Sequence, residues 1–283
     1  MAIKILTDDT CEIPLSECEA LGIEIFPITV SFGDKDYHGE TELPKEKFYE
    51  MLASSDKANK LPKTAQINPY EFEEIFKERL GKDDEIIGLF MSSELSGTHQ
   101  SACIARNMID ENRIHLVDTK NITFGLGLLV YEAVRLRNEG LSARDMHEKL
   151  TEMKTRIRLF AAVDTLKYLK LGGRLSGAAA LIGTLLGIKP IVQVYEGKVL
   201  SIGKAKGYVK ALQEVVNFVK KHPIDESLGM MVGHSNMPEV INQFKELAKN
   251  DINFTNARIM SIGPVVGVHV GPGACGVAYF EKK

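Results

Sequence analysis

A run of hydroxyl side chains separates a buried strand from a helix, and this feature limits the folds that the chain can adopt. The apolar residues 86–90 predict a strand, and residues 99–108 predict a helix. Between them stands Met91-Ser92-Ser93-Glu94-Leu95-Ser96-Gly97-Thr98. In an open parallel sheet, ligands bind beyond the carboxyl ends of the strands, and a helix N-terminus attracts anions. The turn therefore indicates a cradle for a carboxylate or a phosphate, although such hydroxyls often serve only as helix caps.

Strands and helices alternate along the first half of the chain. The hydrophobic pattern predicts strands over 3–6, 24–30, 86–90 and 113–117. It predicts helices over 15–21, 45–53, 69–80, 99–108, 125–139 and 143–154. Asn68 is a candidate N-cap, with Pro69 in the first helical position. The alternation implies a mainly parallel sheet with helices on both faces.

The pattern changes after about residue 155, where strands, a hairpin and helices mix. Strands are expected over 159–163, 228–234, 256–262, 265–270 and 276–280, with a hairpin formed by 190–195 and 198–201. Helices are expected over 164–169, 178–186, 208–220 and 238–248. We therefore predict an α/β protein of two domains. Residues 1–155 would form an N-terminal, mainly parallel α/β sandwich, and residues 156–283 a C-terminal α+β domain.

Charge and composition exclude several classes of function. The formal net charge of -3 gives no electrostatic basis for binding nucleic acid. The longest apolar stretch, 178–188, is too short to span a bilayer, and the chain opens directly on a strand rather than a signal peptide. The four cysteines form no CxxC pair, which is typical of reduced thiols. We expect a cytoplasmic protein without an integral membrane segment, and transient contact with a membrane surface stays open.

Three further polar residues are candidates for the same pocket. Thr64, in a turn before the helix at 69–80, offers a hydroxyl, although it could simply bond within its loop. Arg174 follows a double glycine and could pair with an anionic ligand or with a carboxylate of the fold. His269 lies in a predicted strand, where it is either structural or a partner for an anion.

The common signatures of catalysis and of cofactor binding are absent from the sequence. There is no Walker A motif, no H-E-x-x-H and no G-x-S-x-G. The G-x-G-x-x-G match at 271–276 has neither a following helix nor an acidic residue about 20 positions later. The seven histidines show no metal-ligand spacing. The sequence therefore predicts neither a metal nor a cofactor.

Several segments share their order along the chain with the motifs of one protein family. Ser92–Thr98 matches S-S-x-L-S-G-T, and Asp164–Arg174 matches D-T-L-x-Y-L-x-x-G-G-R. Thr7–Thr10 and Lys63–Gln66 resemble D-S-T and T-S-Q segments, with Asp9 and Ala65 in place of serine. Together these segments resemble the DegV family, bacterial proteins that bind fatty acids. Some members are the fatty-acid-binding subunits of bacterial fatty acid kinase.

The resemblance implies a site and a role. A fatty acid carboxylate would be held at the domain junction by Thr64 and by Ser93, with Ser92 beside it. Arg174 and His269 would stand near the head group. The acyl chain would enter a tunnel in the second domain, with the 178–186 helix as a wall. A separate kinase subunit would phosphorylate the acid and dock near Lys204 and Lys206. The chain itself would be a lipid-binding protein and not an enzyme.

Two other functions stay open at the level of sequence. One is a hydrolase or phosphatase that uses Ser93 as nucleophile, which needs a general base within reach, with His269 as the best candidate. The other is a sensor of small anions, which would have a narrow polar cleft and no apolar channel. Burying a C16 chain yields roughly 12 kcal/mol gross at about 0.8 kcal/mol per carbon. An apolar tunnel would therefore supply most of the affinity for a fatty acid.

Overall fold

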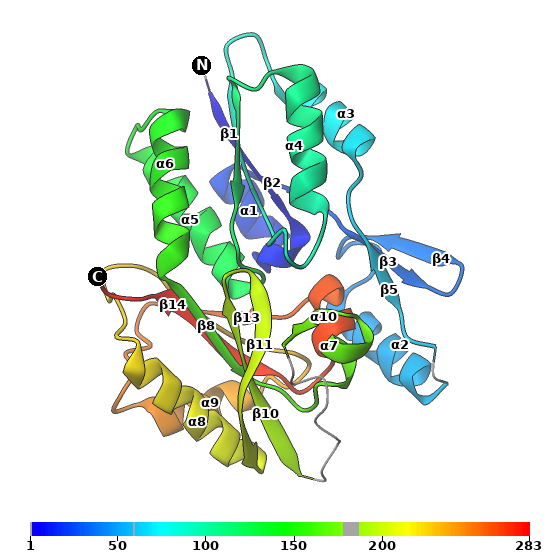
Figure 1. The fold of residues 1–283 in the computed structure, drawn as a ribbon, viewed down its shortest axis with the longest axis vertical. Coiled ribbons are helices and arrows are strands. Elements are labelled where there is room, and N and C mark those ends of the chain that lie inside the picture. The colour runs from blue at the N-terminus through cyan, green and yellow to red at the C-terminus, as the bar shows by residue number, and fades with distance from the viewer. Residues whose placement is uncertain (1, 59, 178–186) are drawn as a thin grey trace.

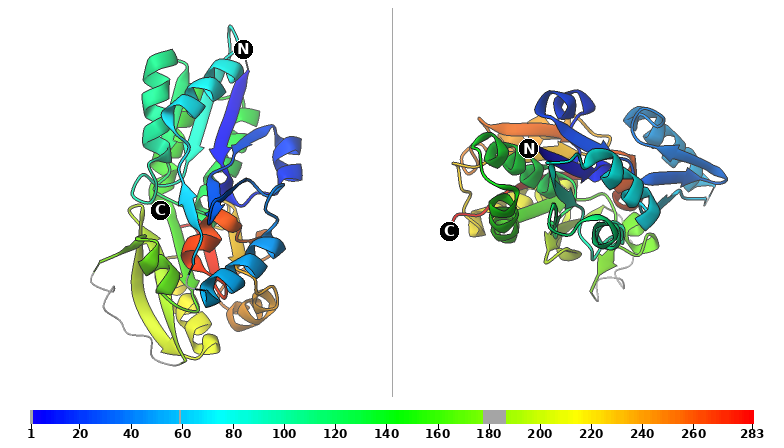
Figure 2. Two further views of the ribbon diagram at one scale, coloured as in Figure 1. Left: turned by 90° about the vertical axis from the view of Figure 1, so that its right-hand side faces the viewer. Right: turned by 90° about the horizontal axis from the view of Figure 1, so that it is seen from above.

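The structure is a computed structural model that describes residues 2–58, 60–177 and 187–283. It has two stacked halves along its long axis (Figure 1). One half is built on a parallel sheet and the other on a mixed sheet, and a small hairpin unit projects to one side (Figure 2). The helix expected over 178–186 lies outside the described residues.

The first half has a four-stranded sheet in which all described neighbours are parallel. Its strands, in order, are β2 (Ile23–Phe26), β1 (Ile3–Asp8), β6 (Glu85–Phe90) and β7 (Ile114–Asp118). The helices α5 (Phe124–Asn138) and α6 (Ala143–Met153) lie on one side, and α3 (Pro69–Arg79) and α4 (Thr98–Ile109) on the other (Figure 1). The short α1 (Leu15–Leu21) packs beside β2. The predicted parallel α/β arrangement is confirmed.

The second half has a mixed sheet of seven strands among the described residues. Its order is β13 (Ala257–Ser261), β12 (Met230–His234), β14 (Cys275–Phe280), β8 (Ile157–Ala162), β10 (Ile188–Tyr195), β11 (Lys198–Lys206) and β9 (Leu175–Ser176). The helices α8 (Tyr208–Lys221) and α9 (Val240–Ala248) pack on it. Because side chains alternate along a strand, Phe160 and Ala162 face these helices, whereas Leu159 and Ala161 face the first half.

A three-stranded antiparallel unit lies beside the junction of the two halves. It consists of β4 (Lys35–His38), β3 (Thr29–Phe32) and β5 (Lys63–Ala65), and α2 (Lys45–Lys57) connects β4 to β5. Elsewhere in the chain, the single turns η1 (Asp9–Cys11) and η2 (Lys154–Arg156) follow β1 and α6. The single strand expected over 24–30 is wrong. Pro27, which has no N–H to donate to a ladder, separates β2 from β3, and the two strands belong to different sheets.

The segment expected as a strand over 265–270 is a helix, α10 (Pro264–Val270). Proline suits the first helical position, and Gly271, at φ +71°, ends the helix. The valines of this segment favour strands by intrinsic preference, but four successive residues, 265–268, are buried here. Packing therefore overrides propensity. His269 consequently lies on a short helix and not on a strand, while α7 (Lys167–Leu171) packs against it.

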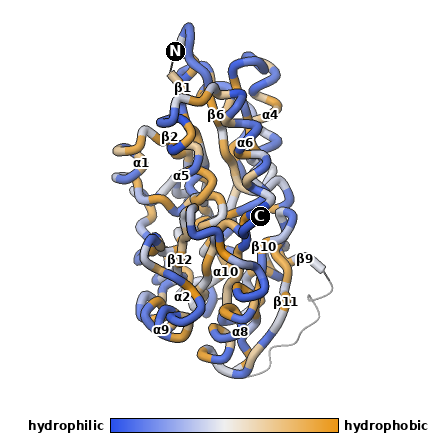
Figure 3. The backbone as a smooth tube through the Cα atoms, turned by 90° about the vertical axis from the view of Figure 1, so that its left-hand side faces the viewer, coloured by the Kyte–Doolittle hydropathy of each residue, from blue (hydrophilic) through white to orange (hydrophobic). Residues whose placement is uncertain are grey.

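The two sheets come from separate stretches of sequence, but their cores are continuous. The parallel sheet uses residues up to 118, and the mixed sheet begins at residue 157. One cluster of buried apolar side chains nevertheless runs from Ile5 to Phe280. Peripheral helices such as α2, α8 and α9 alternate between hydrophilic and hydrophobic residues, as expected for helices with one buried face (Figure 3). A domain boundary at residue 155 stays a prediction.

Candidate functional site

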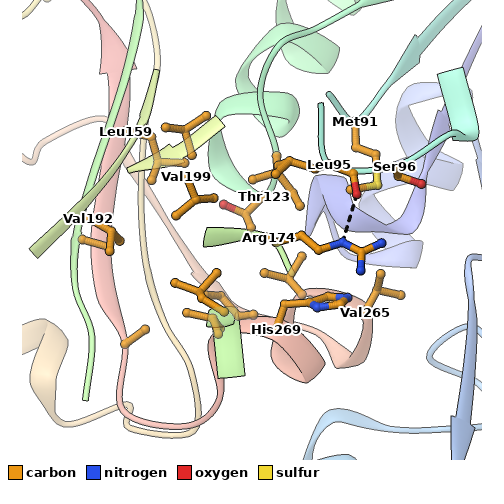
Figure 4. A pocket seen from close by; sticks show the side chains of 18 of the residues that line it. Met91, Leu95, Ser96, Thr123, Leu159, Arg174, Val192, Val199, Val265 and His269 are labelled. Atoms are coloured by element: carbon orange, nitrogen blue, oxygen red, sulfur yellow. Dashed lines mark hydrogen bonds between the residues drawn. The ribbon is translucent and has the colours of Figure 1, made fainter. Parts of the chain in front are cut away.

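A cavity of about 400 Å³ lies between the two halves. This volume falls within the roughly 300–1,000 Å³ typical of small-molecule sites. Most of its wall is aliphatic and comes from the inner face of the mixed sheet and from α10 (Figure 4). These side chains include Leu159, Ala161, Val163, Val192, Val194, Val199, Val265, Val266 and Val270. The cavity is therefore suited to an apolar chain.

One end of the cavity is polar. It is formed where loops of the first half meet α10 and the segment after α7. The polar side chains that line it are Thr64, Gln66, Ser96, Thr123, Arg174 and His269. Three of these, Thr64, Arg174 and His269, are residues that the sequence singled out, and the fold brings them together. An apolar cavity with one polar end suits an amphipathic ligand.

Thr64 and His269 form a hydrogen-bonded pair across the junction. The Thr64 Oγ1 lies 2.9 Å from His269 Nε2. The other ring nitrogen, Nδ1, is buried and has no partner among the described residues. Burial, and to a smaller extent the positive charge of Arg174, lowers the pKa of His269 to about 4. The imidazole is therefore neutral at pH 7 and carries one N–H that can be donated.

Gly172 lets the segment after α7 approach this histidine closely. A β-carbon built on Gly172 would stand 2.3 Å from His269 Nδ1. Any larger residue would push the ring or the segment away, and Arg174 is only two positions further along. Gly172 thus permits the close approach of this segment to His269.

The Arg174 guanidinium places a positive charge at the polar end of the cavity. Its Nε donates to the carbonyl of Leu95 at 3.2 Å, and its Nη1 donates to the carbonyl of Gly172. No carboxylate of the described residues lies within ion-pair distance of Arg174. A half-buried guanidinium held by carbonyls keeps donors for an anion.

A second hollow, of about 330 Å³, adjoins the polar end. Thr64, Arg174 and His269 line both spaces. Lys63 and Leu171, which are exposed, line the hollow only. The polar residues thus form a thin partition that can be approached from either side.

Ser92 and Ser93 do not line the cavity. Ser93 is exposed, and its Oγ donates to Asp118 at 2.5 Å and accepts from Lys120 Nζ at 2.9 Å. Ser92 is buried, and its Oγ donates to the carbonyl of Gly197 at 2.9 Å, at the turn of the β10–β11 hairpin. That glycine has φ +82°, and a β-carbon on it would lie 2.4 Å from the serine hydroxyl. In this structure the two serines join parts of the fold.

Ser96, from the same turn, lines the cavity in their place. Aspartates from the neighbouring strands hold the turn. Asp8 accepts from the N–H of Met91 at 2.8 Å, and Asp118 accepts from that of Ser93 at 3.1 Å. Burial opposes the ionisation of Asp118, but the hydrogen bonds from Ser93 and Lys120 lower its pKa below the ordinary value. Ser96, Gln66 and Thr123 were not predicted as site residues, although Ser96 lies within the Ser92–Thr98 motif and Gln66 within the Lys63–Gln66 segment.

The hydrolase alternative does not fit this geometry. His269 bonds Thr64, and the Ser93 oxygen instead meets Asp118 and Lys120. Although burial opposes the charge of Lys120, its contact with Asp118 raises the pKa of the ammonium, so it is no base at pH 7. The small-anion sensor does not fit either, because that function needs a narrow polar cleft and the observed wall is aliphatic.

The structure also bears on the proposed docking lysines, on metal binding and on membrane-spanning helices. Lys204 and Lys206 are exposed on β11, away from the cavity wall. Within the described ranges, no group of three or more His, Cys, Asp or Glu residues is placed to hold a metal ion. No described helix has both the length and the apolar composition needed to cross a membrane.

The fold and the cavity define an α/β protein with an internal site for an amphipathic ligand, and sequence comparison gives its family. The family model described as "Uncharacterised protein, DegV family" matches residues 2–282. A DegV domain-containing protein of Caldanaerobacter subterraneus is 35% identical, with 99% of each chain covered. The chain therefore belongs to the DegV family.

Solved structures agree with this assignment. A fatty-acid-binding DegV family protein from Thermus thermophilus superposes with a TM-score of 0.88 at 27% identity, over 100% of both chains. DegV from Bacillus subtilis, described as a fatty acid binding protein, superposes with a TM-score of 0.83 at 31% identity, again over 100% of both chains. The predicted α/β fold, with a parallel sheet and an additional α+β region, is thus confirmed.

Proposed function

We propose that this protein binds one long-chain fatty acid. The carboxylate would lie among Thr64, Ser96, Arg174 and His269, and the chain would lie along the valine-rich wall. The observation that carries the proposal is an aliphatic cavity closed at one end by an arginine that has no carboxylate partner among the described residues. The fatty acids bound by the Thermus and Bacillus relatives support it.

The physical roles of the two ends differ. Burial of a C16 chain yields roughly 12 kcal/mol gross, against an association cost of about 4–15 kcal/mol. The polar end adds a few charge-assisted hydrogen bonds, worth about 1.5–3 kcal/mol each. The chain thus supplies most of the affinity, while the polar end fixes the orientation of the acid.

We also propose that the protein is a cytoplasmic carrier without catalytic activity, which presents the acid to a kinase subunit. The adjoining hollow supports this, because a phosphoryl donor held by a partner could reach the carboxylate without release of the chain. The basic residues Lys204 and Lys206 are the proposed docking points, since they are exposed.

The first test is native mass spectrometry of the freshly purified protein, with lipid extraction of the same sample. A stoichiometric increment that matches a C14–C18 acid is the expected result. An apo mass that also fails to change after addition of oleate or palmitate would overturn the proposal.

The carrier role has its own test, in which acyl phosphate formation is followed with a DegV-linked kinase subunit. The double variant Lys204→Glu/Lys206→Glu should take up palmitate normally but slow phosphorylation at least about tenfold. Lys82→Glu/Lys282→Glu, a pair of exposed charge reversals elsewhere, is the matched control. An unchanged rate in the double variant would remove these lysines from the interface.

A further inference from the structure

Thr123 is the one polar side chain of the described cavity wall whose hydroxyl has no hydrogen-bond partner among the described residues. Thr64 bonds His269, Ser96 bonds Thr98 at 2.9 Å, and Gln66 bonds Ser101 at 3.1 Å. Thr123 is only 5% exposed. A buried hydroxyl that faces a cavity and has no protein partner is free to bond a ligand.

The backbone at Thr123 is held in an unusual conformation. Thr123 has φ 48° and ψ −123°, a conformation that a β-branched residue rarely adopts. The position is fixed by its carbonyl, which accepts from the N–H of Gly127 at 2.9 Å as the first bond of α5. On the preceding side, the Asn121 carbonyl accepts from the N–H of Ser92 at 2.8 Å. These bonds hold the backbone of the loop, and with it the β-carbon of Thr123, at the wall of the cavity.

The Thr123 hydroxyl lies where the polar end of the cavity meets the aliphatic wall (Figure 4). It points into the cavity between Val199 and Arg174, whereas Ser96 and the Arg174 nitrogens lie toward the opposite side (Figure 4). An unsubstituted acyl chain that passes this point removes water from the hydroxyl and provides no hydrogen-bond partner in its place. A chain that carries an oxygen at this depth would restore the hydrogen bond.

We infer that the cavity selects long-chain acids that carry a hydrogen-bonding oxygen on the chain near the carboxyl end, and that Thr123 determines this specificity. The inference rests on the proposed function, since it assumes a fatty acid with its carboxylate beside Arg174. It adds a second polar recognition point, which separates hydroxylated acids from unsubstituted acids of the same length.

The test compares palmitate, 2-hydroxypalmitate and 3-hydroxypalmitate by calorimetric titration of delipidated protein. The wild-type protein should bind at least one of the hydroxy acids about tenfold more tightly than palmitate, the effect of one well-made buried hydrogen bond. Thr123→Val, which keeps the shape of the side chain, should abolish that preference and bind palmitate at least as tightly as the wild type. Thr123→Ser should restore the preference.

Thr155→Val is the matched control, because Thr155 is exposed and outside the cavity wall. Equal affinities of the wild-type protein for all three acids would overturn the inference and leave fatty acid binding intact. An equal loss for all three acids in Thr123→Val would also overturn it, since Thr123 would then bond the carboxylate. If none of the acids bound the wild-type protein, the proposed function itself would fail.

Discussion

Two polar clusters lie close to the same edge of the parallel sheet, and they differ in what is left unpaired. The turn cluster consists of Ser93, Asp118 and Lys120, and its hydroxyl, carboxylate and ammonium bond one another. The cavity cluster consists of Thr64, Arg174 and His269. In the latter, one ring nitrogen has no partner and the guanidinium has no carboxylate among the described residues.

The difference shows how a ligand site can be told from a structural network. Both clusters contain a hydroxyl, a cation and a third polar group, so composition does not distinguish them. Buried polar groups are nearly always hydrogen-bonded, and exceptions call for an explanation. The turn cluster is complete and joins parts of the fold, whereas the proposed fatty acid carboxylate would complete the cavity cluster. Removing groups from each cluster tests this contrast.

The largest effect should come from Arg174→Met, which keeps most of the aliphatic stem and removes the charge. Because charge-assisted hydrogen bonds contribute about 1.5–3 kcal/mol, palmitate affinity should fall about 10- to 100-fold. The affinity for hexadecan-1-ol, which has no carboxylate, should change little. Titration of both ligands against the folded variant measures the contrast.

Lys120→Met is the control in the turn cluster, since it removes one positive charge in the same way. We expect palmitate affinity to stay within about twofold of the wild-type value. Similar losses in the two variants would show that the clusters do not differ in function.

The second effect concerns pH and the unprotonated His269. Its pKa is about 4 in the folded protein and near 6.5 in the unfolded chain, so the unfolded chain binds more protons between these values. Stability should therefore fall as the pH drops through this window, by about 2 kcal/mol between pH 7 and pH 5. Chemical unfolding of the wild type and of His269→Gln at both pH values isolates this contribution.

A bound carboxylate should reduce this pH dependence, because a nearby negative charge raises the pKa of a histidine. The protein saturated with palmitate is thus expected to lose less stability on acidification than the apo protein. The same slope in wild-type and His269→Gln protein would refute the assignment of the pH effect to this ring.

The third effect compares two hydroxyls. Thr64→Val removes the partner of His269 Nε2 and the proposed donor to the carboxylate, and palmitate affinity should fall about fivefold. Ser93→Ala, although Ser93 is the serine that the family resemblance favoured, should change affinity about twofold or less. A greater loss in Ser93→Ala than in Thr64→Val would place the head group at the turn cluster instead.

Local signals predicted much of the fold and only part of the site. The helix at 69–80 was predicted from Asn68 and Pro69, and the structure has the full capping box with Glu71. The α10 helix was not predicted, because buried contacts outweigh the strand preference of its valines. Within the serine-rich turn, the three-dimensional path of the chain decides which hydroxyl faces the cavity. No local pattern encodes that Ser96 does so and Ser93 does not.

The smallest effect tests how the cavity cluster is held in position. Three side chains of the first half contact three consecutive residues just before α10. Lys45 Nζ donates to the Ser261 carbonyl at 2.8 Å, the Tyr49 hydroxyl donates to that of Ile262 at 3.0 Å, and the Gly263 N–H donates to Glu12 at 2.7 Å. Because α10 carries His269, these contacts position the ring opposite Thr64.

Tyr49→Phe removes one of these contacts and keeps the packing of the ring. The free energy of unfolding should fall by about 1 kcal/mol, since the buried carbonyl of Ile262 loses its donor. Palmitate affinity should fall less than about threefold, because the other two contacts still hold the segment. Chemical unfolding and titration of the same variant separate the two quantities. A large loss of affinity at unchanged stability would mean that Tyr49 acts on the ligand directly, and the cavity cluster would then have to be extended to include it.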